Sequence, residues 1–374
     1  MSSPGYDVVI VGGGIVGAAI AAEFTREKMT VAIVEAGVIS GGATAAGMGH
    51  IVVMDDSEAQ FALTRYSQRI WRELAPELPT DCEYMECGTI WVAADEEEIA
   101  EARRKQSYYA ERVVAVEVLD ANQLSKAEPN LRRGLAGGLL VPQDAVVYPP
   151  CVVRMLVERA QSNGATLFLG KRTEKIDDLG VTLTDGSRIS SGLTVNATGA
   201  WATKLMPQLA IQPRKGHLLI TDRYPGFIRH QLVELGYLKC AHTLTAESVA
   251  FNVQPRMTGQ LLIGSSRQLG SDDPRIEQQM LSHMLQRAVE YIPGLGELSS
   301  IRSWTGFRAA TPDKLPLIGP CPGYEHVFLA TGHEGLGITT SLGTAKLIVD
   351  QALGRKPEIP VEPYLPSRAM KAHE

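Results

Sequence analysis

The chain has 374 residues, 44% of them hydrophobic and 21% charged, which is typical of a globular protein with about two domains. The formal net charge of −6 and the lack of a basic run give no support for a nucleic-acid partner. The cysteines are scattered without a Cys-x-x-Cys pair, so we expect reduced thiols and no metal site.

An apolar run near the N-terminus, Val8–Ala22, resembles the hydrophobic core of a signal peptide. It lacks a preceding basic region, contains several glycines and is closed by Glu23, so we expect a cytoplasmic protein instead. The run is better explained by a buried strand at Asp7–Val11 and a helix at Ile15–Lys28. With a second strand at Thr30–Glu35 they form one β-α-β unit.

Helical and strand-like segments alternate through the rest of the chain. We expect helices at Glu58–Leu74, Asp95–Arg112, Val152–Asn163, Ile276–Tyr291 and Gly337–Leu353. We expect strands at Gly88–Ala93, Ala165–Gly170, Leu193–Ala197 and His326–Ala330, with a hairpin turn at Asp185–Gly186. This order predicts an α/β fold in which a second, sheet-containing domain interrupts a doubly wound one. The expected ranges are 1–80, 140–210 and 308–374 for the first domain, and 81–139 and 211–307 for the second.

A glycine fingerprint joins the first strand to the first helix. Gly12 allows a tight turn, Gly14 lets the backbone approach a pyrophosphate, and Gly17 lets helix and strand pack closely. Glu35 ends the second strand, where its carboxylate can accept hydrogen bonds from ribose hydroxyls. The pattern predicts a dinucleotide site made by Gly12, Gly14, Ile15, Val16, Gly17, Glu35 and Ala36. A plain glycine turn without a ligand is the alternative interpretation.

Two later segments favour FAD over NAD. Asn196–Trp201 ends a strand in small residues, which permits close backbone approach to a ligand. Thr331–Gly337 follows another strand and opens a helix, whose N-terminus can stabilise negative charge on the N1–C2 carbonyl edge of a reduced flavin. An NAD-binding domain has no need of this distant glycine turn.

Several ordered motifs together give the chain a family resemblance. They are Gly12–Gly17 with Glu35, Gly42–Thr44, Ala46–Met48, Asn196–Trp201, Pro213–His217, Gly306–Arg308 before Thr311–Asp313, Leu317–Gly319 and Thr331–Gly337. In these the chain resembles the FAD-dependent amine and amino-acid oxidoreductases, and looks closest to the glycine oxidase, D-amino-acid dehydrogenase and hydroxyproline dehydrogenase branch. The resemblance implies a glutathione-reductase-like, Rossmann-type FAD-binding domain with an inserted α+β substrate domain of antiparallel sheet.

The resemblance also implies roles for individual residues. Contacts to FAD would come from Gly42, Ala43, Thr44, Ala46, Gly47, Met48, Thr173, Ala197, Thr198, Gly199, Trp201, Gly332, His333, Gly335, Leu336, Gly337 and Ile338. Gly306 stands where sarcosine oxidases carry the cysteine that tethers FAD, so non-covalent FAD is expected. Leu262 stands where those enzymes carry a lysine that speeds reaction with oxygen, which favours a dehydrogenase slightly over an oxidase.

The expected chemistry centres on Arg308, whose guanidinium could clamp a substrate carboxylate, although a structural ion pair is the alternative. The α-carbon hydrogen would leave as hydride to flavin N5 and give an imine. Met48 would lie close to the substrate, and His50 is the best candidate among the possible pocket histidines His50, His217, His242 and His333. Structural roles are the better interpretation for Tyr237, His242 and Arg256 in the substrate domain, and packing for Trp201.

The substrate and the partners stay open at this stage. A small D-amino acid or secondary amine such as D-hydroxyproline, D-proline, sarcosine or glycine fits the branch, with D-hydroxyproline as first choice. The electron acceptor could be oxygen, a quinone or a partner subunit, and either a homo- or a hetero-oligomer is compatible with the sequence. The alternatives are a flavin-bearing subunit without its own turnover and a pyridine-nucleotide dehydrogenase. A tRNA-modifying flavoprotein is disfavoured by the acidic charge.

Overall fold

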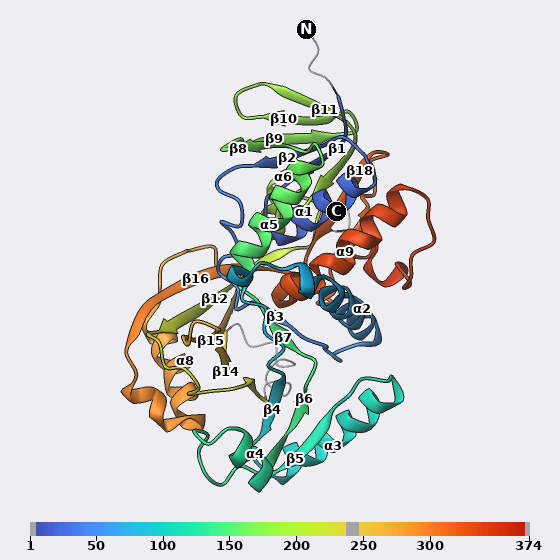
Figure 1. Cartoon of the computed structure of the whole chain (residues 1–374). Helices are drawn as coiled ribbons and strands as arrows, with labels where there is room; N and C mark the ends of the chain where they lie inside the picture. Colours follow the sequence, from blue (N-terminus) through green and yellow to red (C-terminus); the bar gives the residue numbers. More distant parts are fainter. Residues whose placement is uncertain (1–4, 237–246, 371–374) are drawn as a thin grey trace. The chain divides into compact units, whose positions relative to one another are not determined.

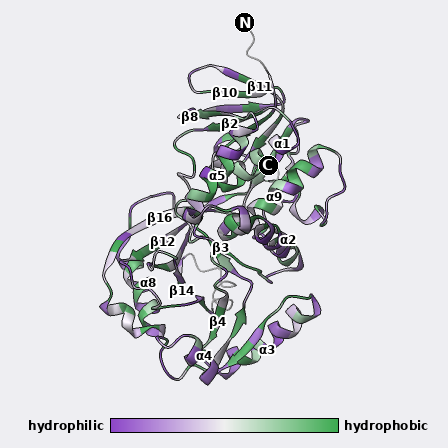
Figure 2. Ribbon diagram, in the orientation of Figure 1, coloured by the Kyte–Doolittle hydropathy of each residue, from purple (hydrophilic) through white to green (hydrophobic). Residues whose placement is uncertain are grey.

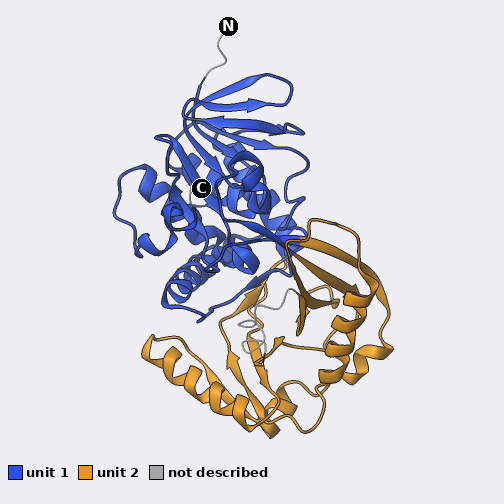
Figure 3. Ribbon diagram, turned by 180° about the vertical axis from the view of Figure 1, so that it is seen from behind, with its two compact units in different colours: residues 1–82, 148–214, 307–374 blue, residues 83–147, 215–306 orange. Residues whose placement is uncertain are grey.

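The computed structural model describes residues 5–236 and 247–370, which form two compact units (Figure 3). Unit 1 consists of Met1–Cys82, Tyr148–Arg214 and Phe307–Glu374, and unit 2 of Glu83–Val147 and Lys215–Gly306. The chain returns to unit 1 at Tyr148 and not at the expected residue 140. The reason is that β6 (Gly137–Val141) is hydrogen-bonded to two strands of unit 2, β4 (Thr89–Ala93) and β5 (Glu117–Asp120).

Unit 1 is built on a twisted, mainly parallel sheet (Figure 1). Its strands, in spatial order, are β17 (Leu317–Pro320), β18 (Val327–Thr331), β11 (Arg188–Asn196), β1 (Tyr6–Val11), β2 (Val31–Glu35) and β8 (Thr166–Leu169). All neighbours run parallel except the edge strand β17. An antiparallel extension, β9 (Thr173–Asp177) and β10 (Gly180–Leu183), pairs with the first part of β11. This is the doubly wound arrangement expected from the glycine fingerprint.

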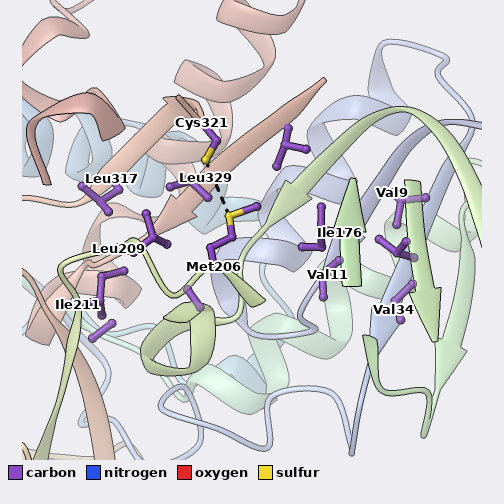
Figure 4. Packing of buried hydrophobic residues seen from close by; sticks show 14 of the residues in the cluster. Val9, Val11, Val34, Ile176, Met206, Leu209, Ile211, Leu317, Cys321 and Leu329 are labelled. Carbon is purple, nitrogen blue, oxygen red and sulfur yellow. Dashed lines mark hydrogen bonds between the residues drawn. The ribbon is translucent and has the colours of Figure 1, made fainter. Parts of the chain in front are cut away.

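Helices pack on this sheet because their inward residues are small or apolar. The helices of unit 1 are α1 (Ile15–Arg26), α2 (Glu58–Leu74), α5 (Pro149–Ser162), α6 (Ala202–Leu205) and α9 (Gly337–Ala352). The helix α1 contacts both α5 and α9, and α2 packs on α9. The opposite face of β1 and β2 presents Val9, Val11 and Val34 to a core that also holds Ile176 and Met206 (Figure 4).

Unit 2 contains a second sheet of mainly antiparallel strands. In spatial order they are β16 (Ser300–Ala310), β12 (Gln212–Thr221), β15 (Leu261–Leu269), β14 (Glu247–Pro255), β13 (Gln231–Glu234), β4 (Thr89–Ala93), β6 and β5 (Glu117–Asp120). Its helices are α3 (Glu96–Glu111), α4 (Ala121–Ala127) and α8 (Gln278–Tyr291), and β7 covers Ala145–Val146. One face of the sheet packs on α8 through residues such as Phe251, Ile263 and Met284.

Hydropathy follows these elements. The strands β1 and β4 are hydrophobic along most of their length, whereas α2 and α3 carry many hydrophilic residues (Figure 2). The helix α2 buries Phe61, Leu63 and Trp71 and leaves residues such as Glu73 in solvent. Within the described ranges, no helix combines the length and the hydrophobicity that crossing a bilayer requires.

Candidate active site

The glycine turns of unit 1 gather at one edge of its sheet. The strands β1, β11 and β18 run parallel, so the turns that follow them start from the same side. The amide of Ala197 donates to the carbonyl of Val11 at 2.9 Å, and Thr331 Oγ1 donates to the carbonyl of Gly199 at 2.9 Å. The strand order reverses next to β1, and open α/β sheets bind ligands at this kind of switch point.

The first turn is shaped so tightly that only glycine fits. Gly12 has a φ of +112°, and a Cβ there would lie 2.6 Å from the carbonyl oxygen of Ala197. A Cβ on Gly17 would lie 2.0 Å from the carbonyl oxygen of Gly12. The helix α1 starts at Ile15 with no side-chain cap from Gly14 and no acidic residue in its first turn. Its N-terminus is therefore suited to an anion such as a pyrophosphate.

Side chains beside this turn hold the backbone in place. Glu35 accepts a hydrogen bond from the amide of Gly13 at 2.7 Å with Oε2 and one from Gly37 at 2.7 Å with Oε1. A carboxylate has further lone pairs, so Glu35 can still accept from ribose hydroxyls. Thr44 Oγ1 accepts from the amide of Ile15 at 3.1 Å and so ties the 42–48 segment to α1.

Two buried hydroxyls next to these residues have no hydrogen-bond partner among the described residues: Ser40 Oγ and Thr173 Oγ1. Ser40 has a φ of +63°, and its amide donates to the carbonyl of Gly13 at 2.8 Å. Thr173 begins β9, close to β2, because the amide of Lys171 donates to the carbonyl of Glu35 at 2.9 Å. Sequence reasoning missed Ser40, since its only signal is its place before two glycines.

The second glycine turn leads into α9. Gly332 has a φ of +78°, and a Cβ there would lie 2.7 Å from Thr311 Cγ2. The helix α9 begins at Gly337, again without a side-chain cap and without an acidic residue in its first turn. A Cβ on Gly47 would lie 2.8 Å from Ile338 Cδ1, so the segment with Ala46 and the buried Met48 lies against the start of α9.

His50 and Arg308 both lie against this turn. His50 Nε2 is 3.1 Å from the carbonyl oxygen of Gly335, and a Cβ on Gly335 would lie 3.9 Å from Arg308 Cδ. Burial, reinforced by the nearby charge of Arg308, lowers the pKa of His50 to about 4. His50 is therefore neutral at pH 7, and its buried Nδ1 has no hydrogen-bond partner among the described residues.

The charge around Arg308 is partly balanced. Burial lowers the pKa of the Arg308 guanidinium from its usual value, and the carboxylate of Glu334 opposes this effect. Glu334 is itself ion-paired with Arg214. Because the pKa of arginine starts far above neutrality, Arg308 remains a cation and can bind a carboxylate with two parallel N–H groups.

Comparison with known proteins agrees with this geometry. The model of the family described as "FAD dependent oxidoreductase" matches residues 7–351. The chain belongs to this family. It is 30% identical to glycine oxidase of Geobacillus kaustophilus over 376 residues, which cover 96% of each chain. It is 27% identical over 432 residues to the hydrogen cyanide synthase subunit HcnC of Pseudomonas protegens, with 97% of this chain and 96% of that protein covered.

Solved structures show the same relationship. The crystal structure of glycine oxidase from Geobacillus kaustophilus matches with a TM-score of 0.88 and 28% identity, covering 98% of this chain and 100% of that chain. L-Proline dehydrogenase from P. horikoshii shares the fold at a TM-score of 0.87 and 22% identity, covering 97% of each chain. This protein is thus an FAD-dependent oxidoreductase with the expected Rossmann-type domain.

The residues of unit 1 fit FAD. Two glycine turns leave space that a Cβ would fill, and each leads into a helix with an uncapped N-terminus. The partnerless hydroxyl of Ser40 can donate to a cofactor oxygen. The side chain of His333 is less suited to such a contact: its Nε2 is 3.0 Å from Thr344 Oγ1, and burial lowers its pKa to about 3. Its backbone, within the turn, remains available.

Other predicted residues have structural partners. His217 is buried in unit 2, with Nδ1 2.8 Å from Ser266 Oγ and Nε2 accepting from the amide of Glu277 at 3.0 Å. Arg256 donates to Glu83 with Nε at 2.9 Å. Trp201 makes an edge-to-face contact with Phe307 at 5.6 Å between ring centroids. Tyr237 and His242 lie outside the described residues. Among the described residues, no group of three His, Cys, Asp or Glu side chains could hold a metal ion.

Proposed function

We propose that this FAD-dependent oxidoreductase oxidises the carbon–nitrogen bond of a small amino acid to an imine. The substrate in this proposal is a D-amino acid or a secondary amine such as D-hydroxyproline, D-proline, sarcosine or glycine, with D-hydroxyproline as first choice. The observation that carries it is the position of Arg308, a partly buried cation lying against Gly335 in the turn that opens α9. A carboxylate bound there lies next to the proposed flavin-binding turn.

The residues have distinct roles in this reaction. FAD supplies, when bound, a two-electron acceptor for the hydride that leaves the α-carbon. Arg308 binds the substrate carboxylate and fixes the orientation of the α-carbon. His50 accepts an N–H of the neutral substrate amine with its partnerless Nδ1 and so orients the nitrogen lone pair. The electron pair of the nitrogen then forms the C=N bond of an iminium ion as the hydride leaves. The iminium ion gives up its N–H proton to water, and water hydrolyses the released imine.

The electron acceptor and the assembly are a second part of the proposal. Leu262 at the position of an oxygen-activating lysine favours a dehydrogenase slightly over an oxidase. Similarity to HcnC, a subunit of hydrogen cyanide synthase, supports a second candidate: a flavin-bearing subunit of a heteromeric amino-acid dehydrogenase that needs its partners for turnover. The expected cytoplasmic location stays a prediction, which cell fractionation checks.

An anaerobic flavin-bleaching screen tests the proposal. The FAD-loaded protein is mixed, without oxygen, with D- and L-proline, both hydroxyproline epimers, glycine, sarcosine and common D-amino acids. We expect loss of the oxidised flavin absorbance with at least one of them, and repeating the reaction with oxygen or with a dye as oxidant separates an oxidase from a dehydrogenase. If none of the compounds bleaches the flavin, the protein does not turn over independently, and the subunit candidate is favoured.

A further inference from the structure

Glu334 is held in an unusual backbone conformation in the turn between β18 and α9. Its φ is +47°, a left-handed conformation that a residue with a long side chain rarely adopts. Its carboxylate forms an ion pair with Arg214, and both side chains are largely buried, at 11% and 18% exposure. Such strain persists where the surrounding structure enforces it, and it is common at ligand-binding sites. The ion pair and the surrounding structure therefore hold the side chain of Glu334 in one position.

This fixed carboxylate stands beside the proposed carboxylate-binding group. Glu334 directly precedes Gly335, which lies against Arg308 and whose carbonyl accepts from His50. The charges described at this position are thus two guanidinium cations, Arg308 and Arg214, and one carboxylate, while His50 is neutral. Of these charges, the Glu334 carboxylate raises the pKa of Arg308 and Arg214 lowers it, so both act directly on the proposed carboxylate-binding group.

A second carboxylate on the substrate would not find a free cation of the kind that Arg214 could provide. The guanidinium that could receive it, Arg214, already binds Glu334. The fixed Glu334 carboxylate would repel it, and repulsion between like charges is strong in a partly buried site. Such a repulsive element is an effective way to exclude a competing ligand.

We infer that Glu334, anchored by Arg214, is a specificity-determining residue that restricts the site to amino acids with a single carboxylate. The inference rests on the proposed function, in which Arg308 binds that carboxylate. Glu334 itself transfers no proton and takes no part in the bond changes. The substrate class is thereby narrowed to amino acids with a single carboxylate, to the exclusion of dicarboxylic amino and imino acids.

Binding of simple carboxylates to the FAD-loaded protein tests this inference without turnover. Propionate, malonate and monomethyl malonate have no amine, so they isolate the effect of the second charge. Their dissociation constants are measured from the perturbation of the flavin spectrum and by calorimetry. We expect propionate and monomethyl malonate to bind similarly, and malonate at least about tenfold more weakly. Malonate binding as tightly as its monoester would overturn the inference.

The Glu334→Gln variant removes the charge and retains the shape, because the amide oxygen can still accept from Arg214. We expect the ratio of malonate to propionate affinity to rise about tenfold or more in this variant. The matched control is Glu325→Gln, at an exposed position of unit 1, which should leave the ratio unchanged. A ratio that stays within threefold of the wild-type value in Glu334→Gln would overturn the inference. The ligand comparison in the wild-type protein decides the matter if the variant does not fold.

The two proposals fail in different ways. If propionate binds and Arg308→Lys weakens it, but the second charge has no effect, the role of Glu334 is wrong and that of Arg308 stands. If propionate neither binds nor perturbs the flavin, Arg308 is not a carboxylate-binding group, and both proposals are wrong.

Discussion

His50 Nε2 lies 3.1 Å from the carbonyl oxygen of Gly335 and links β3 (His50–Ile51) to the turn before α9. Thr339 Oγ1 adds a second link, donating to the carbonyl of His50 at 2.9 Å. Because a carbonyl can only accept, the proton of the neutral imidazole must be on Nε2. The other nitrogen, Nδ1, is then an acceptor that has no hydrogen-bond partner among the described residues, and the proposed mechanism assigns it the substrate amine.

The partly buried imidazole of His50 makes the stability of the fold depend on pH in a definite direction. The pKa of His50 is lowered from 6.5 to about 4 in the folded protein, so between these values the unfolded chain binds more protons. The contribution to the free energy of unfolding is complete above pH 6.5 and is lost as the pH falls toward 4. We expect a loss of about 1.4 kcal/mol per pH unit from this residue within that window. Denaturant unfolding at pH 7, 6 and 5 measures it.

The His50→Gln variant isolates this effect. Its amide nitrogen can replace Nε2 as donor to Gly335, but it does not titrate. The variant should lose less stability than the wild type between pH 7 and pH 5, while a residual slope remains because the pKa of His333 is lowered in the same sense. Equal slopes of stability against pH for the two proteins would show that His50 is protonated without cost, contrary to its lowered pKa.

Replacing Gly12 by alanine should abolish tight FAD binding. The new Cβ would lie 2.6 Å from the carbonyl oxygen of Ala197 on a backbone with φ of +112°, so the turn must move. We expect the dissociation constant for FAD, measured by flavin fluorescence, to rise at least about tenfold. Gly186→Ala is the matched control, because φ is +81° there but a Cβ would meet nothing within 4 Å. Equal loss of FAD in both variants would indicate general destabilisation.

Local signals in the sequence were sufficient to predict where the main helices begin. The helix expected at Glu58–Leu74 is confirmed with these bounds, because Ser57 caps it by accepting from the amide of Gln60. Asp95 caps α3 in the same way, accepting from the amide of Glu98. The glycine fingerprint also indicated the start of α1. The crowding at Gly17 is local, because a Cβ there would meet the carbonyl oxygen of Gly12, whereas the crowding at Gly12 comes from the distant Ala197.

Contacts between distant residues could not be predicted. Arg214 and Glu334 are far apart in the chain, and no spacing rule indicates that they form an ion pair. The partnerless hydroxyl of Ser40 depends on a loop conformation that no sequence motif specifies. The boundary between the two units at Tyr148 depends on the pairing of β6 with β4 and β5. The hydrophobic pattern alone does not determine which strands pair.

Changing Arg308 to lysine should weaken substrate binding more than it slows the chemistry. Lysine keeps the positive charge but loses the planar fork that binds a carboxylate with two hydrogen bonds. With a charged hydrogen bond contributing about 1.5–3 kcal/mol, we expect KM to rise about tenfold to a hundredfold. Steady-state kinetics with the substrate found in the bleaching screen measures the change. Arg103→Lys, at an exposed position of α3, is the control and should leave KM unaltered. An unchanged KM in Arg308→Lys would contradict the carboxylate role.

FAD should be released completely when the protein is denatured. Tethering a flavin through cysteine requires a reactive thiolate, and the family resemblance predicts Gly306 at the position of the cysteine that serves this purpose in sarcosine oxidases. Burial raises the pKa of Cys82, Cys87 and Cys321 to about 11, so these thiols stay protonated and unreactive at neutral pH. After acid precipitation we expect all flavin absorbance in the supernatant and a colourless pellet. A yellow pellet that keeps its flavin after washing would show a covalent bond, and mass spectrometry of its peptides would then identify the attached residue.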